Sequence, residues 1–292
     1  MLYHSPIITP LSHESSQLSM LRLDLIDPEI SGNKWFKLKY NLQKARGLGK
    51  STILTFGGAF SNHIAATAAA CHRQGFQSIG IIRGEASSQS NDTLSRAKQL
   101  GMQLLFVSRE EYKQKDEGGY LQTLSQRFPD AYIIPEGGDN ALGQKGCEEI
   151  LSKETQTFEH IFCAYGTGTT FKGLAKTLEP HQSLYGINVL KYEAGSDLPQ
   201  STIINDYHFG GYARHTQELL DFKTWFEATF RIGLDYVYTA KACYAVFDLI
   251  RQGKISREAN ILVIHSGGLQ GNAGYEARYS LNPRRQVNDP QG

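Results

Sequence analysis

The chain has 292 residues, of which 40% are hydrophobic and 20% are charged. These fractions are ordinary for a folded globular protein and exclude disorder as the main state. Thirty basic residues against 29 acidic ones leave a formal net charge of +1. This balance gives no electrostatic argument for nucleic acid or an anionic membrane as a partner.

Leader and cysteine patterns predict the compartment. Residues 1–20 contain neither a basic start nor an apolar run, and no stretch approaches 18 apolar residues, so neither a signal peptide nor a membrane span is expected. The four cysteines are scattered without a C-x-x-C pair, so we expect small buried hydrophobes rather than disulfides or metal ligands; they are Cys71, Cys147, Cys163 and Cys243. The sequence therefore predicts a cytoplasmic protein without a metal site.

Short apolar runs alternate with helical patterns from residue 51 almost to the end. The strands are expected at residues 51–58, 78–85, 102–109, 131–138, 160–170, 183–190 and 259–268. The helices are expected at residues 61–75, 91–101, 120–128, 142–154, 173–180, 216–230 and 241–253, with Asn91 or Asp92 capping the second of them. Such alternation predicts an α/β fold with mainly parallel strands and helices on both faces of the sheet.

Several common nucleotide and hydrolase signatures are missing from this α/β pattern. No G-x-G-x-x-G opens a helix after the first strand, and no P-loop, H-E-x-x-H or G-x-S-x-G motif occurs. A nicotinamide-dependent oxidoreductase is therefore disfavoured.

A glycine- and threonine-rich loop, residues 166–170, follows an apolar strand and precedes a helical segment. Glycines allow successive backbone N–H groups to converge, hydroxyls add donors, and a helix N-terminus favours an anion. Since the loop contains no lysine, it suits a phosphate monoester better than a triphosphate; a plain strand-to-helix turn is the alternative.

Four further stretches contain residues that can carry chemistry. Lys34 follows Gly32 and Asn33 and is surrounded by aromatic residues, where desolvation would make its amine nucleophilic. The run Ser61-Asn62-His63 opens an expected helix and suits either a carboxylate or simple helix capping. The segments DYVYTAK, residues 235–241, and HSGG, residues 265–268, are by themselves equally consistent with core packing.

Taken together, six ordered motifs resemble the pyridoxal-phosphate family of D-cysteine desulfhydrase and 1-aminocyclopropane-1-carboxylate deaminase, within the tryptophan-synthase-β-like (fold type II) enzymes. The resemblance spans about residues 20–275 and rests on the segments GNKWFKL, GGAFSNH, IPEGGDNALGQKG, YGTGTT, VYTAK and HSGG. It implies two three-layer α/β domains with the cofactor in the cleft between them. The large domain would comprise residues 1–37 and 143–292, and the small inserted domain residues 38–142.

The resemblance also implies roles for individual residues. Lys34 would hold pyridoxal 5'-phosphate covalently and later move the substrate's α-proton. The cofactor phosphate would lie against Gly166, Thr167, Gly168, Thr169 and Thr170. Asn62 would bind the phenolic oxygen of the cofactor, and Thr239 would face its ring nitrogen. The substrate carboxylate would bind Ser61, Asn62 and His63, and the two active-site tyrosines would be Tyr238 and Tyr212.

Two residues within this resemblance bear on the substrate. Deaminases of the cyclopropane acid resemble one another in having Gln and Glu where this chain has His63 and Thr239. A hydroxyl cannot hold a proton on the ring nitrogen as a carboxylate does, so we expect α,β-elimination from D-cysteine to pyruvate, ammonia and hydrogen sulfide. The alternatives are the deaminase, which gives 2-oxobutanoate and ammonia, and a non-catalytic cofactor-binding protein.

The chain departs from the family pattern at two places. The acidic and basic run expected before Gly32 is replaced by LDLIDPEI, residues 23–30, and Ala240 stands where a glycine is expected. These differences affect the expected substrate fit more than the fold. The resemblance further implies lyase or hydrolase chemistry on a small amino acid, and a homodimer.

Overall fold

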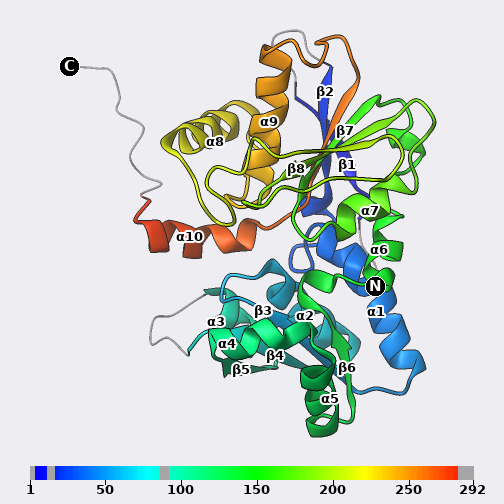
Figure 1. Ribbon diagram of the computed structural model, residues 1–292, viewed down its shortest axis with the longest axis vertical. Coiled ribbons are helices and arrows are strands. Elements are labelled where there is room, and N and C mark those ends of the chain that lie inside the picture. Colours follow the sequence, from blue (N-terminus) through cyan, green and yellow to red (C-terminus); the bar gives the residue numbers. More distant parts are fainter. Residues whose placement is uncertain (1–3, 12–16, 86–91, 282–292) are drawn as a thin grey trace.

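Two separate β-sheets organise the chain in the computed structural model, which describes residues 4–11, 17–85 and 92–281 (Figure 1). One sheet has six strands and the other four. In Figure 1 the six-stranded sheet occupies the upper half of the view and the four-stranded sheet the lower half.

The six-stranded sheet is built from both ends of the chain. Its order is β1-β2-β10-β7-β8-β9, with all neighbours parallel except the antiparallel pair β1 and β2. The strands are β1 (Ile7–Pro10), β2 (Leu18–Arg22), β7 (His160–Tyr165), β8 (Ser183–Asn188), β9 (Ser201–Ile204) and β10 (Ile261–His265).

The four-stranded sheet is wholly parallel and has the order β5-β4-β3-β6. Its strands are β3 (Thr52–Gly57), β4 (Gln77–Arg83), β5 (Met102–Val107) and β6 (Ala131–Ile134). Side chains alternate between its two faces, as strand geometry requires. Ile53 belongs to the apolar cluster of α2 and α3, whereas Leu54 packs in a separate cluster with Tyr112 of α4 and Leu124 of α5.

Helices cover both faces of both sheets, which gives three layers in each half. The four-stranded sheet is flanked by α2 (Asn62–Gln74), α3 (Asp92–Gln99), α4 (Arg109–Lys113) and α5 (Gly118–Arg127). The other helices are α1 (Asn33–Gly47), α6 (Ala141–Cys147), α7 (Thr169–Ala175), α8 (Gln217–Phe230), α9 (Thr239–Arg251) and α10 (Asn272–Tyr279). The α/β class with parallel sheets is thus confirmed.

Every strand and helix expected from the sequence is present, but two helices end early. The helix expected over residues 173–180 begins at Thr169 and ends at Ala175. The helix expected over residues 142–154 stops at Cys147. Gly146 lies so close to α1 that a Cβ there would stand 1.9 Å from the Phe36 carbonyl oxygen. The N–H groups of residues 148–150 donate to the carbonyl oxygens three residues earlier in the chain. Ser152 and Thr155 then form a separate capping box. The Asn91 cap lies outside the described residues, and β1, β2, β9, α1, α4 and α10 were not expected.

The division of the sheets bears on domain boundaries. Strands β3 to β6 all fall within residues 38–142, and all strands of the six-stranded sheet fall outside that range. We propose on this basis the two domains expected above, residues 1–37 with 143–292 and residues 38–142.

The four cysteines are buried, as expected, and all four are free thiols in the structure. Within the described residues, no helix is both long enough and apolar enough to cross a membrane.

Candidate active site

A cavity of about 360 Å³ is lined by the ends of both sheets and by the N-terminus of α1. This volume falls in the range of small-molecule sites. Most residues predicted from the sequence line it: Lys34, Ser61, Asn62, His63, Gly166, Thr167, Gly168, Thr169, Thr170, Tyr212 and Tyr238. We call it the inner cavity.

Lys34 is the second residue of α1 and is only 7% exposed. The chain turns into this helix at Gly32 (φ +70°), where a Cβ would lie 2.0 Å from the Ser266 carbonyl oxygen, so only glycine fits. The Lys34 Nζ donates to Asn33 Oδ1 at 3.0 Å. Burial, assisted by the neighbouring charge of Lys37, lowers the pKa of Lys34 well below its usual value. The amine is therefore able to act as a nucleophile or base.

The glycine–threonine loop lies between β7 and α7, at the helix N-terminus. Gly168 adopts φ +89°, and the Thr170 hydroxyl accepts a hydrogen bond from Asn33 Nδ2 at 2.9 Å. The Thr169 hydroxyl donates to Asp139 Oδ1 at 2.6 Å. The first N–H groups of a helix have no acceptor within the helix, so this end of the cavity attracts an anion.

Lys37 adds a positive charge beside this loop, which the sequence reading did not anticipate. It lines the inner cavity, is 4% exposed, and its pKa is lowered by burial. It lies three residues after Lys34 on α1, and residues at that spacing share a helix face. No helix over residues 33–47 was predicted, and without that helix the shared face of Lys34 and Lys37 could not be recognised.

Ser61 and His63 open α2 at the opposite wall. Ser61 is the N-cap, and its side chain accepts from the Ile64 N–H at 3.3 Å, so it combines capping with lining the cavity. The Thr55 hydroxyl donates to the Ile134 carbonyl oxygen, so its 2.8 Å contact with His63 Nε2 requires His63 to be the donor.

His63 is consequently left with a buried acceptor. Burial and the nearby Lys34 and Lys37 hold the pKa of His63 well below 6.5, so the ring is neutral and Nδ1 carries no proton. Nδ1 is buried and has no hydrogen-bond partner among the described residues. In this tautomer the ring cannot donate to a carboxylate; it requires a donor from a bound group.

Tyr212 and Tyr238 stand together, their rings edge to face with centroids 6.2 Å apart. Burial, with the neighbouring Tyr212 and Asp235, raises the pKa of Tyr238 well above 10, so its phenol stays protonated. Tyr212 belongs to a loop that the buried Lys241 holds by donating to the carbonyls of His208 (2.8 Å) and Gly211 (2.7 Å). Burial lowers the pKa of Lys241 to about 8.

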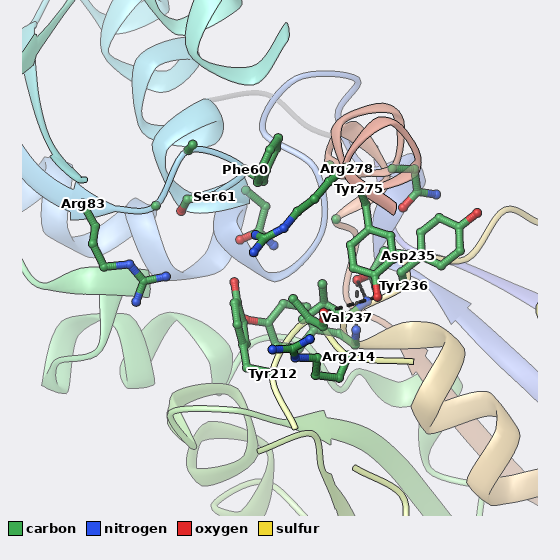
Figure 2. A pocket seen from close by; sticks show the side chains of 18 of the residues that line it. Phe60, Ser61, Arg83, Tyr212, Arg214, Asp235, Tyr236, Val237, Tyr275 and Arg278 are labelled. Atoms are coloured by element: carbon green, nitrogen blue, oxygen red, sulfur yellow. Dashed lines mark hydrogen bonds between the residues drawn. The ribbon is translucent and has the colours of Figure 1, made fainter. Parts of the chain in front are cut away.

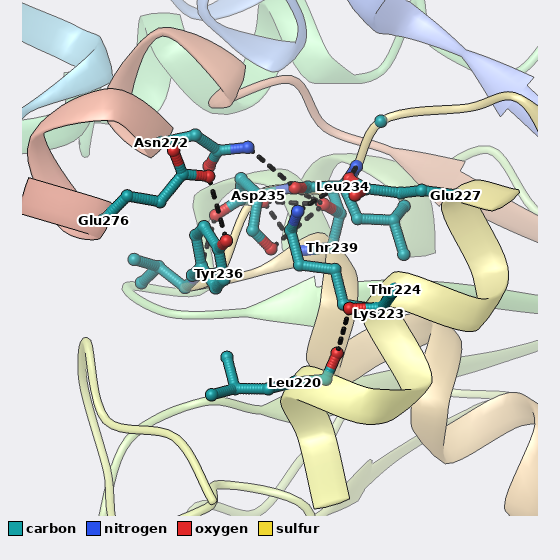
Figure 3. A network of polar contacts seen from close by, with 12 residues as sticks. Leu220, Lys223, Thr224, Glu227, Leu234, Asp235, Tyr236, Thr239, Asn272 and Glu276 are labelled. Carbon is teal, nitrogen blue, oxygen red and sulfur yellow. Dashed lines mark hydrogen bonds and ion pairs between the residues drawn. The ribbon is translucent and has the colours of Figure 1, made fainter. Parts of the chain in front are cut away.

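Thr239, in contrast, is not among the residues that line the inner cavity. Its hydroxyl accepts from the Asp235 N–H at 2.7 Å and donates to Asp235 Oδ1 at 2.8 Å, inside a network that joins α8, α9 and α10 (Figure 3). The Thr239 hydroxyl is thus bonded to Asp235, and the expectation that Thr239 faces a cofactor ring gains no support from the cavity lining.

Ser266 offers a hydroxyl to the inner cavity instead. It follows β10, is 8% exposed, and its hydroxyl forms no hydrogen bond within residues 4–11, 17–85 and 92–281. Its segment HSGG was noted in the sequence, but nothing in the residue type alone distinguished it from a strand terminus.

Residues 23–30, the unusual segment before Gly32, lie outside the inner-cavity lining. Asp27 accepts from Arg73 and from the N–H groups of Glu29 and Ile30, and Glu29 also pairs with Arg73 (2.8 Å) and Arg96 (2.5 Å). Asp27 and Glu29 thus tie the segment to α2 and α3, whereas Asp24 pairs with Arg22 of β2 at 2.6 Å. None of these three carboxylates lines the inner cavity.

Comparison with known proteins identifies the class of this site. The sequence pattern of the pyridoxal-phosphate dependent enzymes matches residues 6–202. A relative from Thermotoga maritima, provisionally named a 1-aminocyclopropane-1-carboxylate deaminase, is 33% identical over 280 residues, covering 86% of this chain and 88% of its own. A D-cysteine desulfhydrase from Klebsiella pneumoniae is 28% identical over 289 residues, covering 88% of each.

Solved structures agree with the fold. The crystal structure of a 1-aminocyclopropane-1-carboxylate deaminase homologue matches with a TM-score of 0.79 and 26% identity, over 95% of this chain and 93% of that one. A hydrogen sulfide-producing enzyme from Fusobacterium nucleatum has a TM-score of 0.69 at 11% identity, over 92% and 97%, and supports the fold alone. The chain belongs to the pyridoxal-phosphate dependent enzymes, in the family of 1-aminocyclopropane-1-carboxylate deaminase and D-cysteine desulfhydrase. This family fits lyase chemistry, so the expectation of a hydrolase is wrong.

The residues present fit pyridoxal phosphate. The cavity provides a buried neutralisable amine at Lys34, an anion-attracting loop with Lys37 beside it, and the orphaned Nδ1 of His63. The Lys34 amine suits the cofactor aldehyde, and the loop with Lys37 suits the cofactor phosphate. His63 Nδ1 suits a hydrogen-bond donor on a bound group. Among the described residues no cluster of His, Cys, Asp and Glu is arranged to hold a metal ion.

Proposed function

We propose that the protein catalyses α,β-elimination from D-cysteine, giving pyruvate, ammonia and hydrogen sulfide. The observation that carries this proposal is the absence of a buried carboxylate from the inner-cavity lining within the described residues. Glu136 is the one carboxylate there, and its side chain is 36% exposed and 3.7 Å from Lys115. A ring without a carboxylate partner is a weaker electron sink.

Each step can be assigned to residues of this chain. Bound pyridoxal phosphate supplies an electron-accepting ring conjugated with the substrate α-carbon. Lys34 would hold it covalently, and the Lys34 amine, once free, would remove the substrate α-proton. Thr167, Thr169, Thr170 and the adjoining glycines, with Lys37, hold the phosphate, and Asn62 binds the phenolic oxygen. Ser266, in place of Thr239, supplies the neutral hydroxyl for the ring.

The substrate carboxylate is assigned to the N-terminus of α2. Ser61, Asn62 and the His63 backbone N–H lie at this positive helix end. The His63 ring serves as an acceptor, in keeping with its tautomer. Tyr212 and Tyr238, as neutral phenols, can donate a hydrogen bond or a proton to the departing sulfur.

D-Cysteine suits this site better than the cyclopropane acid for two reasons. Lys34 needs an α-proton, which the cyclopropane acid lacks. A weak electron sink also favours prompt departure of a good leaving group, and thiolate leaves more readily than hydroxide. D-Cysteine should therefore react faster than D-serine, and the cyclopropane acid slowly or not at all.

The second candidate, 1-aminocyclopropane-1-carboxylate deaminase, is favoured by the provisional name of the relative from Thermotoga maritima. One substrate panel separates the two: D- and L-cysteine, D- and L-serine and the cyclopropane acid, scored for keto acid and sulfide. Turnover of the cyclopropane acid equal to or above that of D-cysteine would overturn the proposal.

We further propose a cytoplasmic location, which rests on the sequence pattern, and assembly as a homodimer, which rests on the resemblance. Light scattering of the purified holoenzyme at several concentrations tests the dimer directly.

A further inference from the structure

A second hollow, of about 580 Å³, adjoins the inner cavity, and we call it the outer vestibule. The two share Gly58, Ser61, Asn62, Arg83, Tyr212 and Tyr238 as lining residues. A small amino acid bound beside Lys34 needs only the inner cavity. The vestibule is larger than the inner cavity, and the proposed elimination of D-cysteine does not require it.

The vestibule is lined by five cationic side chains that come from both halves of the molecule. Arg83 ends β4, and Arg109 and Lys113 are the first and last residues of α4, whereas Arg214 precedes α8 and Arg278 belongs to α10. Figure 2 shows Arg83 on one side of the space and Arg214 and Arg278 on the other.

None of these five cations forms an ion pair within the part of the chain that the structure describes. Two contact aromatic rings: Arg83 lies 5.6 Å from the centroid of the Tyr112 ring, and Arg278 lies 5.6 Å from that of Tyr279. Elsewhere on this surface, Arg73 and Arg96 are both paired with carboxylates. Among the described residues that line the vestibule there are thus five cations and one carboxylate.

The carboxylate in the vestibule lining, Asp235, does not compensate for them. Its two oxygens accept from the N–H groups of Val237 (2.8 Å), Tyr238 (2.9 Å) and Thr239 (2.7 Å) and from the Thr239 hydroxyl. Those bonds fix the turn into α9 and direct the carboxylate inward on its own loop. Like charges on facing walls repel, so this arrangement favours a bound anion that lies between them.

We propose that the outer vestibule binds an anionic group at the far end of the substrate side chain, so that the preferred substrates are β-substituted amino acids whose leaving group itself carries a carboxylate or similar anion. This inference rests on the proposed elimination and extends it. The reaction breaks the Cα–H and Cβ–S bonds; the thiolate leaves and takes up a proton, and the released enamine adds water to give pyruvate and ammonia. Arginine suits such recognition because its planar fork binds carboxylates through two hydrogen bonds.

The test uses a matched pair of substrates of equal size. S-(2-Carboxyethyl)cysteine and its carboxamide, S-(2-carbamoylethyl)cysteine, differ only in the terminal charge; each is prepared as the D and the L enantiomer. With the wild-type holoenzyme at low salt, we expect kcat/KM to favour the carboxylate by at least about tenfold, mainly through KM. The preference should fall as sodium chloride rises from 20 to about 500 mM, because salt screens exposed charges.

Substitutions of vestibule arginines test which side chains produce the preference for the carboxylate. Arg214→Gln and Arg278→Gln together should reduce the carboxylate preference by at least about fivefold, and Arg83→Gln should reduce it further. Arg127→Gln, an exposed arginine on α5 outside the vestibule lining, is the matched control and should leave the preference as it was. A preference near one, or one that the double substitution does not change, would overturn the inference.

Binding separates this inference from the proposed function. Calorimetric titration of the holoenzyme with the carboxylate and the carboxamide gives their affinities even if neither is turned over. If D-cysteine is eliminated but the two ligands bind equally, the vestibule inference fails and the function stands. If D-cysteine is not eliminated but the carboxylate binds at least about tenfold more tightly, the function fails and the inference stands.

Discussion

The inner cavity and the outer vestibule share a wall but satisfy their polar groups differently. In the inner cavity the polar atoms are buried and largely bonded to one another: Lys34 to Asn33, Asn33 to Thr170, and Thr169 to Asp139. In the vestibule the charged ends are exposed and unpaired within the described residues. A network built before the ligand arrives is suited to hold a resident group in one geometry. Cations held apart on facing walls are suited to a group that comes and goes.

The largest effect is expected at Lys34, the reactive group of the inner cavity. Lys34→Ala should remove the visible absorption of the bound cofactor and lower elimination by at least about a thousandfold, because it removes both the covalent attachment and the base. Spectra and pyruvate release measure the two.

Lys39→Ala is the control for Lys34, since Lys39 pairs with Glu149 at 2.5 Å on the outer part of α1. It should keep the absorption band. Borohydride reduction followed by peptide mapping gives an independent answer: cofactor attached to any lysine other than Lys34 would refute the assignment.

Thr170 and Thr169 should differ in their contribution to cofactor binding. The Thr170 hydroxyl accepts from Asn33 and keeps its own proton for an anion, whereas Thr169 gives its proton to Asp139. Thr170→Val should therefore weaken cofactor affinity by at least about tenfold, and Thr169→Val by a smaller factor. Equilibrium dialysis of the cofactor against the apoenzyme measures both.

Thr177→Val is a matched control for these threonines, because the Thr177 hydroxyl donates only to the Leu174 carbonyl oxygen at the end of α7. Unchanged affinity in Thr170→Val would exclude the loop as the phosphate site.

Substitution of Thr239 tests the packing next to Tyr238, which lines both the inner cavity and the outer vestibule. Because its hydroxyl is bonded to Asp235, Thr239→Val should destabilise the fold by about 2 kcal/mol and lower Tm by about 5 °C. The ratio of D-cysteine to D-serine turnover should stay within about twofold, since the hydroxyl is bonded to Asp235 and Thr239 does not line the inner cavity.

The control for Thr239 is Thr224→Val, which removes an exposed hydroxyl bonded to the Leu220 carbonyl oxygen on α8. It should lower Tm by less. An altered substrate ratio at unchanged Tm in Thr239→Val would restore Thr239 as the partner of the ring.

The sequence could predict the fold class and most of the inner cavity because each of those features is local. Lys34 follows a glycine that no other residue can replace, and the loop at residues 166–170 lies where a buried strand meets a helix. The hydrogen bonds of Thr239 could not be predicted, because they depend on where the folded turn before α9 places Asp235.

The outer vestibule could not be predicted from the sequence for a different reason. Arg83 and Arg278 lie on different halves of the molecule and nearly 200 positions apart, and neither belongs to a recognisable motif. Exposed arginines are usually solvated, so their residue type carries no signal. Only the packing of α10 beside the four-stranded half brings them to one space.

The smallest effect is expected at the loop of Tyr212, which borders both spaces. Lys241 holds this loop, and burial lowers the pKa of Lys241 to about 8. In the unfolded chain this amine stays protonated up to about pH 10.4. Between these values the unfolded state binds more protons than the folded state, so the Lys241 contribution to the free energy of unfolding rises with pH.

The loop itself should respond in the opposite direction, because the two bonds to the His208 and Gly211 carbonyls lose their charge assistance as Lys241 loses its proton. Trypsin cleavage after Arg214, relative to cleavage after Arg127, should be about threefold faster at pH 9 than at pH 7.5. Lys241→Met should be cleaved rapidly at both pH values, and its circular dichroism shows whether it remains folded. Equal relative cleavage of the wild type at the two pH values would mean that the charge on Lys241 does not hold Tyr212 in place.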